Sequence, residues 1–263
     1  MLLQRQGQGS NVQDVVVFQI AGLLGLVGMG LTWTGVLARY MGFYDLSLVW
    51  NHVLWGMALG ALVAVLEFDS LFLPYYAAVI DGSDASRGPS LLWLAWWVSM
   101  HSAVVHLFLR RERVRRAGAH VTSGWAFGAT MGGMHGVFLS AQYLNGAPVD
   151  GWVTRTAGTV AFALLLPRLE AVITAWQGLL MLHGRRLGAV IRASLWRMVM
   201  LTLVYYAFFE PLAWLAALAA LGLIEPKVNG WVWSGLDKRA QRMYRRVRAN
   251  AARERRTAER EQE

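Results

Sequence analysis

Long apolar runs separated by short polar stretches dominate the chain. Six of these runs are about as long as the roughly 20 residues that an α-helix needs to cross the hydrocarbon core of a bilayer. Because the runs are continuously apolar and lack the alternation typical of membrane β-strands, they indicate helices. The pattern predicts an all-α, polytopic membrane bundle of about six hydrophobic segments. These are Val15–Ala38, Leu46–Leu66, Leu91–Leu109, Val121–Leu144, Ala157–Leu182 and Met198–Ile224.

Three places interrupt this simple pattern. Leu71–Ile80 is apolar but short and contains Pro74, which favours an interfacial helix or loop over another span. In the last run, Glu210 precedes a proline, so we expect that segment to be broken or re-entrant. The fifth run also contains a proline and two charges, which leaves open that Ala157–Leu182 does not cross. Those residues are Pro167, Arg168 and Glu170.

The chain divides into three predicted parts: an N-terminal tail of residues 1–14, a membrane bundle of residues 15–224, and an interfacial and basic region of residues 225–263. The first apolar run is too long for a signal-peptide core, which favours a retained membrane helix. The last part carries ten of the 25 Lys and Arg residues, between Lys238 and Arg260.

The basic C-terminal region is predicted to form an amphipathic helix on the surface of an anionic leaflet. Its narrow apolar stripe supports this interpretation. A solvated helix that contacts a partner or RNA is the alternative, but Tyr244 is its lone aromatic residue, so nucleic-acid binding is disfavoured. The stripe comprises Leu236, Ala240, Met243, Val247 and Ala251.

Composition and charge placement agree with a membrane protein. The chain is 56% hydrophobic and only 16% charged. Basic residues gather in two short connections, and such connections face the cytoplasm. With a broken last segment, the C-terminus is predicted to be cytoplasmic as well, in a bacterial inner membrane. The two clusters are Arg110, Arg111, Arg113, Arg115 and Arg116, and Arg185, Arg186, Arg192 and Arg197.

Five small residues at four-residue spacing mark one face of the fourth run. Such a face predicts close helix packing, of the glycine-zipper kind, inside the bundle or between protomers of a homo-oligomer. The alternative is a flat wall for a lipid, an isoprenoid or a cofactor ring. The residues are Gly124, Gly128, Gly132, Gly136 and Ser140.

Histidines at membrane depth raise the question of a haem. In the proposed topology His101 and His135 lie near mid-membrane on neighbouring segments, while His52 and His106 lie nearer the cytoplasmic face. The two levels are only about 7–8 Å apart, so at most one b-type haem fits. We expect instead buried histidines with polar partners, and no cofactor or metal. The absence of cysteine excludes disulfides, thiolate metal sites and Fe–S clusters.

Three ionisable residues fall within the last two apolar runs: Arg168, Glu170 and Glu210. Such groups normally pair or line a wet cavity. We expect Arg168 to pair with Glu210 between adjacent segments, because the pair would neutralise both charges. A polar path for a substrate or ions is the alternative.

The region from Tyr205 through Glu210, followed by Gly230-Trp231 and Lys238-Arg239, resembles the C-terminal membrane region of bacterial family 2 glycosyltransferases that make envelope polysaccharides. The resemblance covers about 35 residues. The long soluble domain, Asp-x-Asp and Gln-x-x-Arg-Trp of those enzymes are missing, so no catalytic residue carries over. The resemblance implies a membrane-only companion that holds or guides a lipid or glycan.

No catalytic motif appears, so the sequence does not favour an enzyme. The first functional hypothesis is a non-catalytic, multi-pass subunit of an envelope assembly or export system, working with membrane lipid and other membrane subunits. The second is an electron-transfer subunit with one b-type haem between His101 and His135. The third is a small-solute transporter that uses the ionisable residues of the last two runs.

Overall fold

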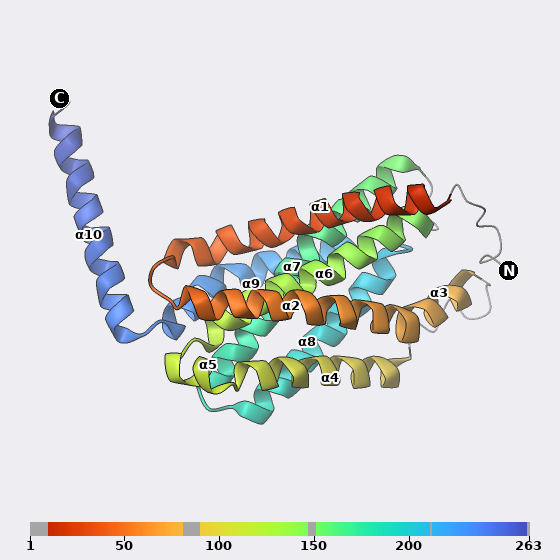
Figure 1. The fold of residues 1–263 in the computed structure, drawn as a ribbon, viewed down its shortest axis with the longest axis horizontal. Coiled ribbons are helices and arrows are strands. Elements are labelled where there is room, and N and C mark those ends of the chain that lie inside the picture. Colours follow the sequence, from red (N-terminus) through yellow and green to blue (C-terminus); the bar gives the residue numbers. More distant parts are fainter. Residues whose placement is uncertain (1–9, 81–89, 147–150, 211, 262–263) are drawn as a thin grey trace.

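The computed structural model describes residues 10–80, 90–146, 151–210 and 212–261. All regular structure in these ranges is helical, and seven long helices form one bundle (Figure 1). They are α1 (Ser10–Val36), α2 (Leu46–Glu67), α4 (Leu91–Leu109), α6 (His120–Gly146), α7 (Trp152–Leu182), α8 (Arg186–Ala207) and α9 (Ala213–Gly235). Helix α8 runs obliquely to α2 and α4 (Figure 1). Five helical stretches are long and apolar enough to cross a membrane. The predicted all-α, multi-pass membrane bundle is therefore confirmed.

The last two predicted segments fold differently from each other. The fifth run forms the single helix α7, with Pro167 inside it. The sixth run is broken, as expected: α8 ends at Ala207 and α9 begins at Ala213, with Glu210 in the connection. Because α8 starts as early as Arg186, the two pieces are full-length helices that run in opposite directions (Figure 1). The described part of the chain therefore forms seven long helices where the sequence predicted about six.

The second helix is longer than its apolar run suggested. A π-helical turn, η2 (Phe68–Phe72), joins α2 directly to α3 (Leu73–Ile80), so the predicted separate interfacial element is a continuation of the second span. A proline ring clashes with the carbonyl four residues earlier in an α-helix, and a wider turn before Pro74 relieves that clash. The buried residue Glu67 lies immediately before this turn.

Helix α6 occupies the centre of the bundle, and nearly all of its residues are buried. It packs against α1, α2 and α7. Glycine, histidine and hydroxyl-bearing residues are frequent in α6, and the helix is not one of the five apolar stretches although it runs beside them.

The glycines of α6 lie against the backbone of α7. A Cβ atom added at Gly124, Gly128 or Gly132 would come within 2.5–2.7 Å of a carbonyl oxygen of α7. At Gly136 the same distance is 3.0 Å. Glycines on α2 play a similar part toward α6, since a Cβ at Gly60 would lie 2.6 Å from the Met131 carbonyl oxygen. Missing side chains thus let the central helices approach closely.

The basic connection and the basic tail share one end of the bundle. The short helix α5 (Glu112–Ala117) carries three of the five arginines of the first cluster, and the turn η1 (Leu37–Tyr40) and the start of α10 (Lys238–Glu261) lie at the same end (Figure 1). Tyr244 of α10 packs on Tyr40, with ring centroids 5.4 Å apart. Beyond this contact α10 leaves the bundle and extends crosswise to its axis.

The boundaries of the three predicted parts do not coincide with the ends of the helices. Residues 1–9 of the predicted N-terminal tail are outside the described ranges. Helix α9 continues past the predicted boundary at residue 225 and ends at Gly235. The interfacial region is thus the last part of a bundle helix, and the separate C-terminal element is α10 alone.

Candidate functional site

An arginine lies in the middle of the bundle core. Arg197 is the twelfth of the 22 residues of α8 and has no solvent exposure. The sequence prediction that placed it in a basic loop with Arg185, Arg186 and Arg192 is wrong for this residue. The run that begins at Met198 is only the second half of α8, so Arg197 lies about 16 Å along the helix from Arg186.

Every donor group of this guanidinium has a partner. Arg197 Nε donates to Glu170 Oε1 of α7 at 2.9 Å, and Nη2 donates to the same oxygen. Nη2 also donates to Thr174 Oγ1 at 2.9 Å, while Nη1 donates to Ser102 Oγ at 2.7 Å and to Gln177 Oε1 at 3.2 Å. The Arg197 cluster, as we call Arg197 with these four partners, therefore joins α4, α7 and α8 through charge-assisted hydrogen bonds.

A second buried carboxylate lies beside this cluster with far fewer partners. Glu67 of α2 is 2% exposed and accepts a hydrogen bond from the hydroxyl of Tyr205 at 2.9 Å. His135 Nε2 of α6 lies 3.5 Å from the same oxygen, Oε1. Among the described residues, no arginine or lysine forms an ion pair with Glu67. The Glu67 cluster, meaning Glu67, Tyr205 and His135, thus joins α2, α6 and α8 without a permanent cation.

A small cavity of about 10 Å³ lies between the two clusters. His101, His135 and Glu170 line it together with apolar residues such as Met200. His101 Nε2 lies 3.4 Å from Glu170 Oε1, and both His101 Nε2 and Glu170 Oε2 are buried without a hydrogen-bond partner among the described residues. A space of this size holds about one water molecule.

This geometry does not fit a haem between His101 and His135. The two histidines do lie at one level, as predicted, because they line the same cavity. However, their Nε2 atoms lie beside the carboxylates of Glu170 and Glu67, and the space between the rings is far smaller than a porphyrin. The expectation of buried histidines with polar partners describes these two residues.

The predicted pair between Arg168 and Glu210 is wrong. Arg168 Nε donates to Glu225 Oε2 of α9 at 2.7 Å, and Nη2 donates to Oε1 of the same carboxylate. Glu210 is exposed in the connection before α9, and its Oε1 accepts from the backbone nitrogen of Leu212 at 3.2 Å. Because α8 is a separate full-length helix, Glu210 lies at the opposite end of α9 from the level of Arg168. Glu170, the third predicted residue, belongs to the Arg197 cluster.

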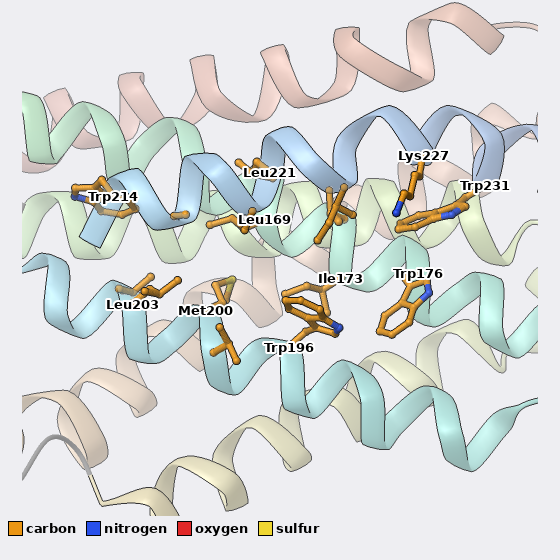
Figure 2. A pocket seen from close by; sticks show the side chains of 16 residues that line it. Leu169, Ile173, Trp176, Trp196, Met200, Leu203, Trp214, Leu221, Lys227 and Trp231 are labelled. Atoms are coloured by element: carbon orange, nitrogen blue, oxygen red, sulfur yellow. The ribbon is translucent and has the colours of Figure 1, made fainter. Parts of the chain in front are cut away.

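A lateral groove of about 330 Å³ lies between α7, α8 and α9, and it is lined almost entirely by apolar side chains (Figure 2). Leu169 and Ile173 of α7 and Met200 of α8 form its middle, and Trp214 lies at one end. From Trp214 to Trp231 it extends about 25 Å along α9, close to the hydrocarbon thickness of a bilayer. Met200 also lines the small cavity, so one side chain separates the groove from the buried polar clusters.

The other end of the groove is chemically different. Lys227 and Trp231 of α9 and Trp176 of α7 lie together there, at the end nearer to α10 (Figure 2). Lys227 is exposed and forms no ion pair with any described residue. Tryptophan and lysine at this depth are typical of the level of lipid headgroups. The groove therefore joins a long apolar wall to a lysine that forms no ion pair within the described part of the chain.

Comparison with known proteins adds no relative: no protein-family model matches the chain, and no characterised protein or solved structure matches it significantly. The likeness of the C-terminal region to family 2 glycosyltransferases therefore rests on its residues alone.

Sequence reasoning missed Glu67, Arg197 and Lys227. Glu67 directly follows an apolar run, and Arg197 directly precedes one, so both were treated as ends of segments. If residues 186–207 had been predicted as one helix, Arg197 would have been placed at mid-membrane. Lys227 lies beyond the predicted end of the bundle at residue 224, but it is part of α9.

Proposed function

We propose that this protein is a non-catalytic, multi-pass membrane subunit that holds an anionic lipid in the groove between α7, α8 and α9, within a bacterial envelope assembly or export system. The observation that carries the proposal is the unpaired Lys227 at the end of a continuous apolar groove. Apolar contacts along the groove would hold an acyl or isoprenoid chain, while the ammonium group would bind a phosphate or carboxylate headgroup.

The position of the groove supports a lipid over a water-soluble solute. Its rim includes exposed and partly exposed side chains of the outer helices, such as Trp196 and Leu203, so a lipid enters sideways from the bilayer. The buried cavity at the centre of the bundle, at about 10 Å³, is too small for an organic solute. These features favour lipid handling over the transporter hypothesis.

The basic end of the bundle supports a cytoplasmic orientation for α5 and α10. Arg113 of α5 and nearly all of α10 are exposed, and cations near helix ends favour the cytoplasmic side. Because α10 extends crosswise to the bundle, it is positioned to lie along the surface of the membrane with Met243 and Val247 toward the acyl chains. Its arginines then face anionic headgroups.

Native mass spectrometry of the purified protein tests lipid binding. With equal amounts of phosphatidylglycerol and phosphatidylcholine as probes, we expect retention of one phosphatidylglycerol per chain. Lys227→Gln should reduce that retention about tenfold, since a hydrogen bond to a charged group contributes roughly 1.5–3 kcal/mol. Lys238→Gln on the exposed start of α10 is the matched control and should change it little. Equal retention of both lipids, or equal effects of both variants, would refute the proposal.

Labelling of engineered cysteines tests the orientation, and the chain has no native cysteine to remove. We expect Arg113→Cys and Thr257→Cys to react with a membrane-impermeant maleimide only when the cytoplasmic face of sealed vesicles is accessible. Both positions are on exposed helical surfaces. Reaction of the two positions from opposite faces would contradict the shared end seen in the structure. Reaction of both from the periplasmic face would reverse the proposed orientation.

A further inference from the structure

The Glu67 cluster contains an acid whose charge is not balanced by the surrounding residues. Its contacts come from three helices: Glu67 itself on α2, the Tyr205 hydroxyl on α8 at 2.9 Å, and His135 Nε2 on α6 at 3.5 Å. A hydroxyl donates one hydrogen bond but carries no charge. Among these contacts, His135 is the only group that can take up a proton and become positively charged.

The neighbouring Arg197 cluster does not supply the missing charge. Arg197 and Glu170 form a buried ion pair with no net charge, and the donors of Arg197 are used by Glu170 and three neutral side chains. His101, on α4, faces Glu170 at 3.4 Å. An ionised Glu67 beside this pair would leave one uncompensated negative charge in a medium of low dielectric constant, which is costly.

We propose that Glu67 is an exchangeable proton-binding site in the bundle core: at neutral pH it is a neutral carboxylic acid beside a neutral His135. Two neutral groups avoid the desolvation of an ion pair. The neutral acid accepts the hydrogen bond of Tyr205, and its own hydroxyl is a donor for a nearby acceptor. Glu67 and Glu170 therefore differ in protonation although both are buried in the same core.

The cavity gives this proton a polar connection to other groups. His135, which lies beside Glu67, is also a wall of the cavity, and His101 Nε2 and Glu170 Oε2 are the unpartnered polar atoms on its other sides. One water molecule in this space would form hydrogen bonds to these groups, which matches the two to four polar partners that buried waters require. Through such a water, the Glu67 cluster would be connected to polar side chains of α4, α6 and α7.

Infrared spectroscopy of the purified protein in lipid nanodiscs tests the proposal. We expect a carboxylic-acid C=O band at neutral pH that disappears in Glu67→Gln and shifts to lower frequency after transfer to D₂O. Glu225→Gln, which alters a partly exposed carboxylate of an ion pair, is the matched control and should leave the band unchanged. Persistence of the band in Glu67→Gln, or its loss in Glu225→Gln, would overturn the assignment to Glu67. A band that does not shift in D₂O would overturn exchangeability.

Two further variants keep the test decisive if Glu67→Gln folds poorly. Tyr205→Phe removes the hydroxyl that donates to Glu67, so the acid band should move to higher frequency without disappearing. An unmoved band means that the acid is elsewhere. His135→Gln replaces the only titratable partner by a neutral amide and should retain the acid band. Loss of a carboxylate band in Glu67→Gln, in place of the acid band, would show an ion pair with a protonated His135 and refute the proposal.

Discussion

Glu170 and Glu67 are two carboxylates in the same bundle core, with side-chain exposures of 2% and 3%, and the protein treats them in opposite ways. Glu170 faces Arg197, whose donors are all used, and also accepts from the Thr174 hydroxyl at 2.9 Å. Glu67 has one tyrosine hydroxyl and one histidine ring. The first carboxylate is balanced by a permanent cation, and the second is proposed to be balanced by a proton.

The difference shows that the partners of a buried acid decide whether its role is structural or proton-binding. A fully paired ion pair resists a change of protonation, because removing either charge leaves the other without compensation. An acid beside neutral groups gains or loses a proton with less rearrangement, which suits a site that responds to pH. The two clusters are joined through α8, which supplies both Arg197 and Tyr205.

The largest expected effect comes from breaking the Arg197 cluster. Glu170→Gln or Arg197→Gln leaves a buried charge without its partner, so each should reduce the free energy of unfolding by about 3–5 kcal/mol. The double variant should lose less than the sum of the two single losses, because it leaves no unpaired charge. Thermal unfolding in one detergent, followed by tryptophan fluorescence, measures all three.

Glu67→Gln is the matched comparison, because it is the same substitution at an equally buried acid. The amide reproduces the shape and neutrality of a protonated carboxyl group, so we expect a loss below about 1 kcal/mol, in the range of ordinary hydrogen-bond changes. A loss as large as that of Glu170→Gln would mean that Glu67 belongs to an ion pair, and the contrast between the two acids would disappear.

A loss of stability of intermediate size is expected at Gly132, where the glycine face of α6 packs against α7 next to Glu170. A Cβ at Gly132 would lie 2.5 Å from the Leu166 carbonyl oxygen and 2.7 Å from Glu170 Cβ. Gly132→Ala therefore forces α6 and α7 apart beneath the ion pair, and we expect a loss of about 1–3 kcal/mol.

Gly30→Ala on α1 controls for the change of residue type. Nothing lies within 4 Å of a Cβ at that exposed position, and alanine favours a helix by up to about 1 kcal/mol over glycine. The control should therefore be neutral or slightly stabilising. Equal behaviour of the two variants in thermal unfolding would show that the close approach of α6 and α7 does not hold Glu170 in place.

The sequence predicted the helical membrane bundle, the break near Glu210 and the common level of His101 and His135, because these follow from run length, proline chemistry and residue spacing. Partner identity did not follow. Arg168 was paired with Glu210 because the two were expected on adjacent segments and would neutralise each other, but the turn before α9 carries the chain back and brings Glu225 to Arg168. Such pairings depend on which helices are neighbours, and hydropathy does not encode that.

The groove shows a second limit of sequence reasoning. Its walls come from residues 169–231 on three helices, and each helix by itself shows only apolar residues with occasional tryptophans. The site around Lys227 is formed by Trp176 on α7 and by the apolar wall of α8. The sequence near Lys227 does not show that these residues are its neighbours. The charged residues at mid-membrane were nevertheless a usable signal: Glu170 was singled out from the sequence, whereas its partner Arg197 was assigned to the basic loop before the last apolar run.

The smallest loss of stability is expected at the Arg168–Glu225 pair. This pair extends the comparison of the two buried carboxylates to one that is partly exposed. Its side chains are 21% and 35% exposed, so solvent screens both charges and lowers the cost of leaving one unpaired. We expect Arg168→Gln and Glu225→Gln each to lose about 1 kcal/mol or less, with a loss that diminishes as salt is added. Glu210→Gln, at an exposed turn without an ion pair among the described residues, should lose less still. Thermal unfolding at low and high ionic strength measures the three variants side by side. A salt-independent loss near that of Glu170→Gln would place Glu225 in a desolvated environment. Solvent exposure would then not explain why breaking this ion pair costs less than breaking the buried one.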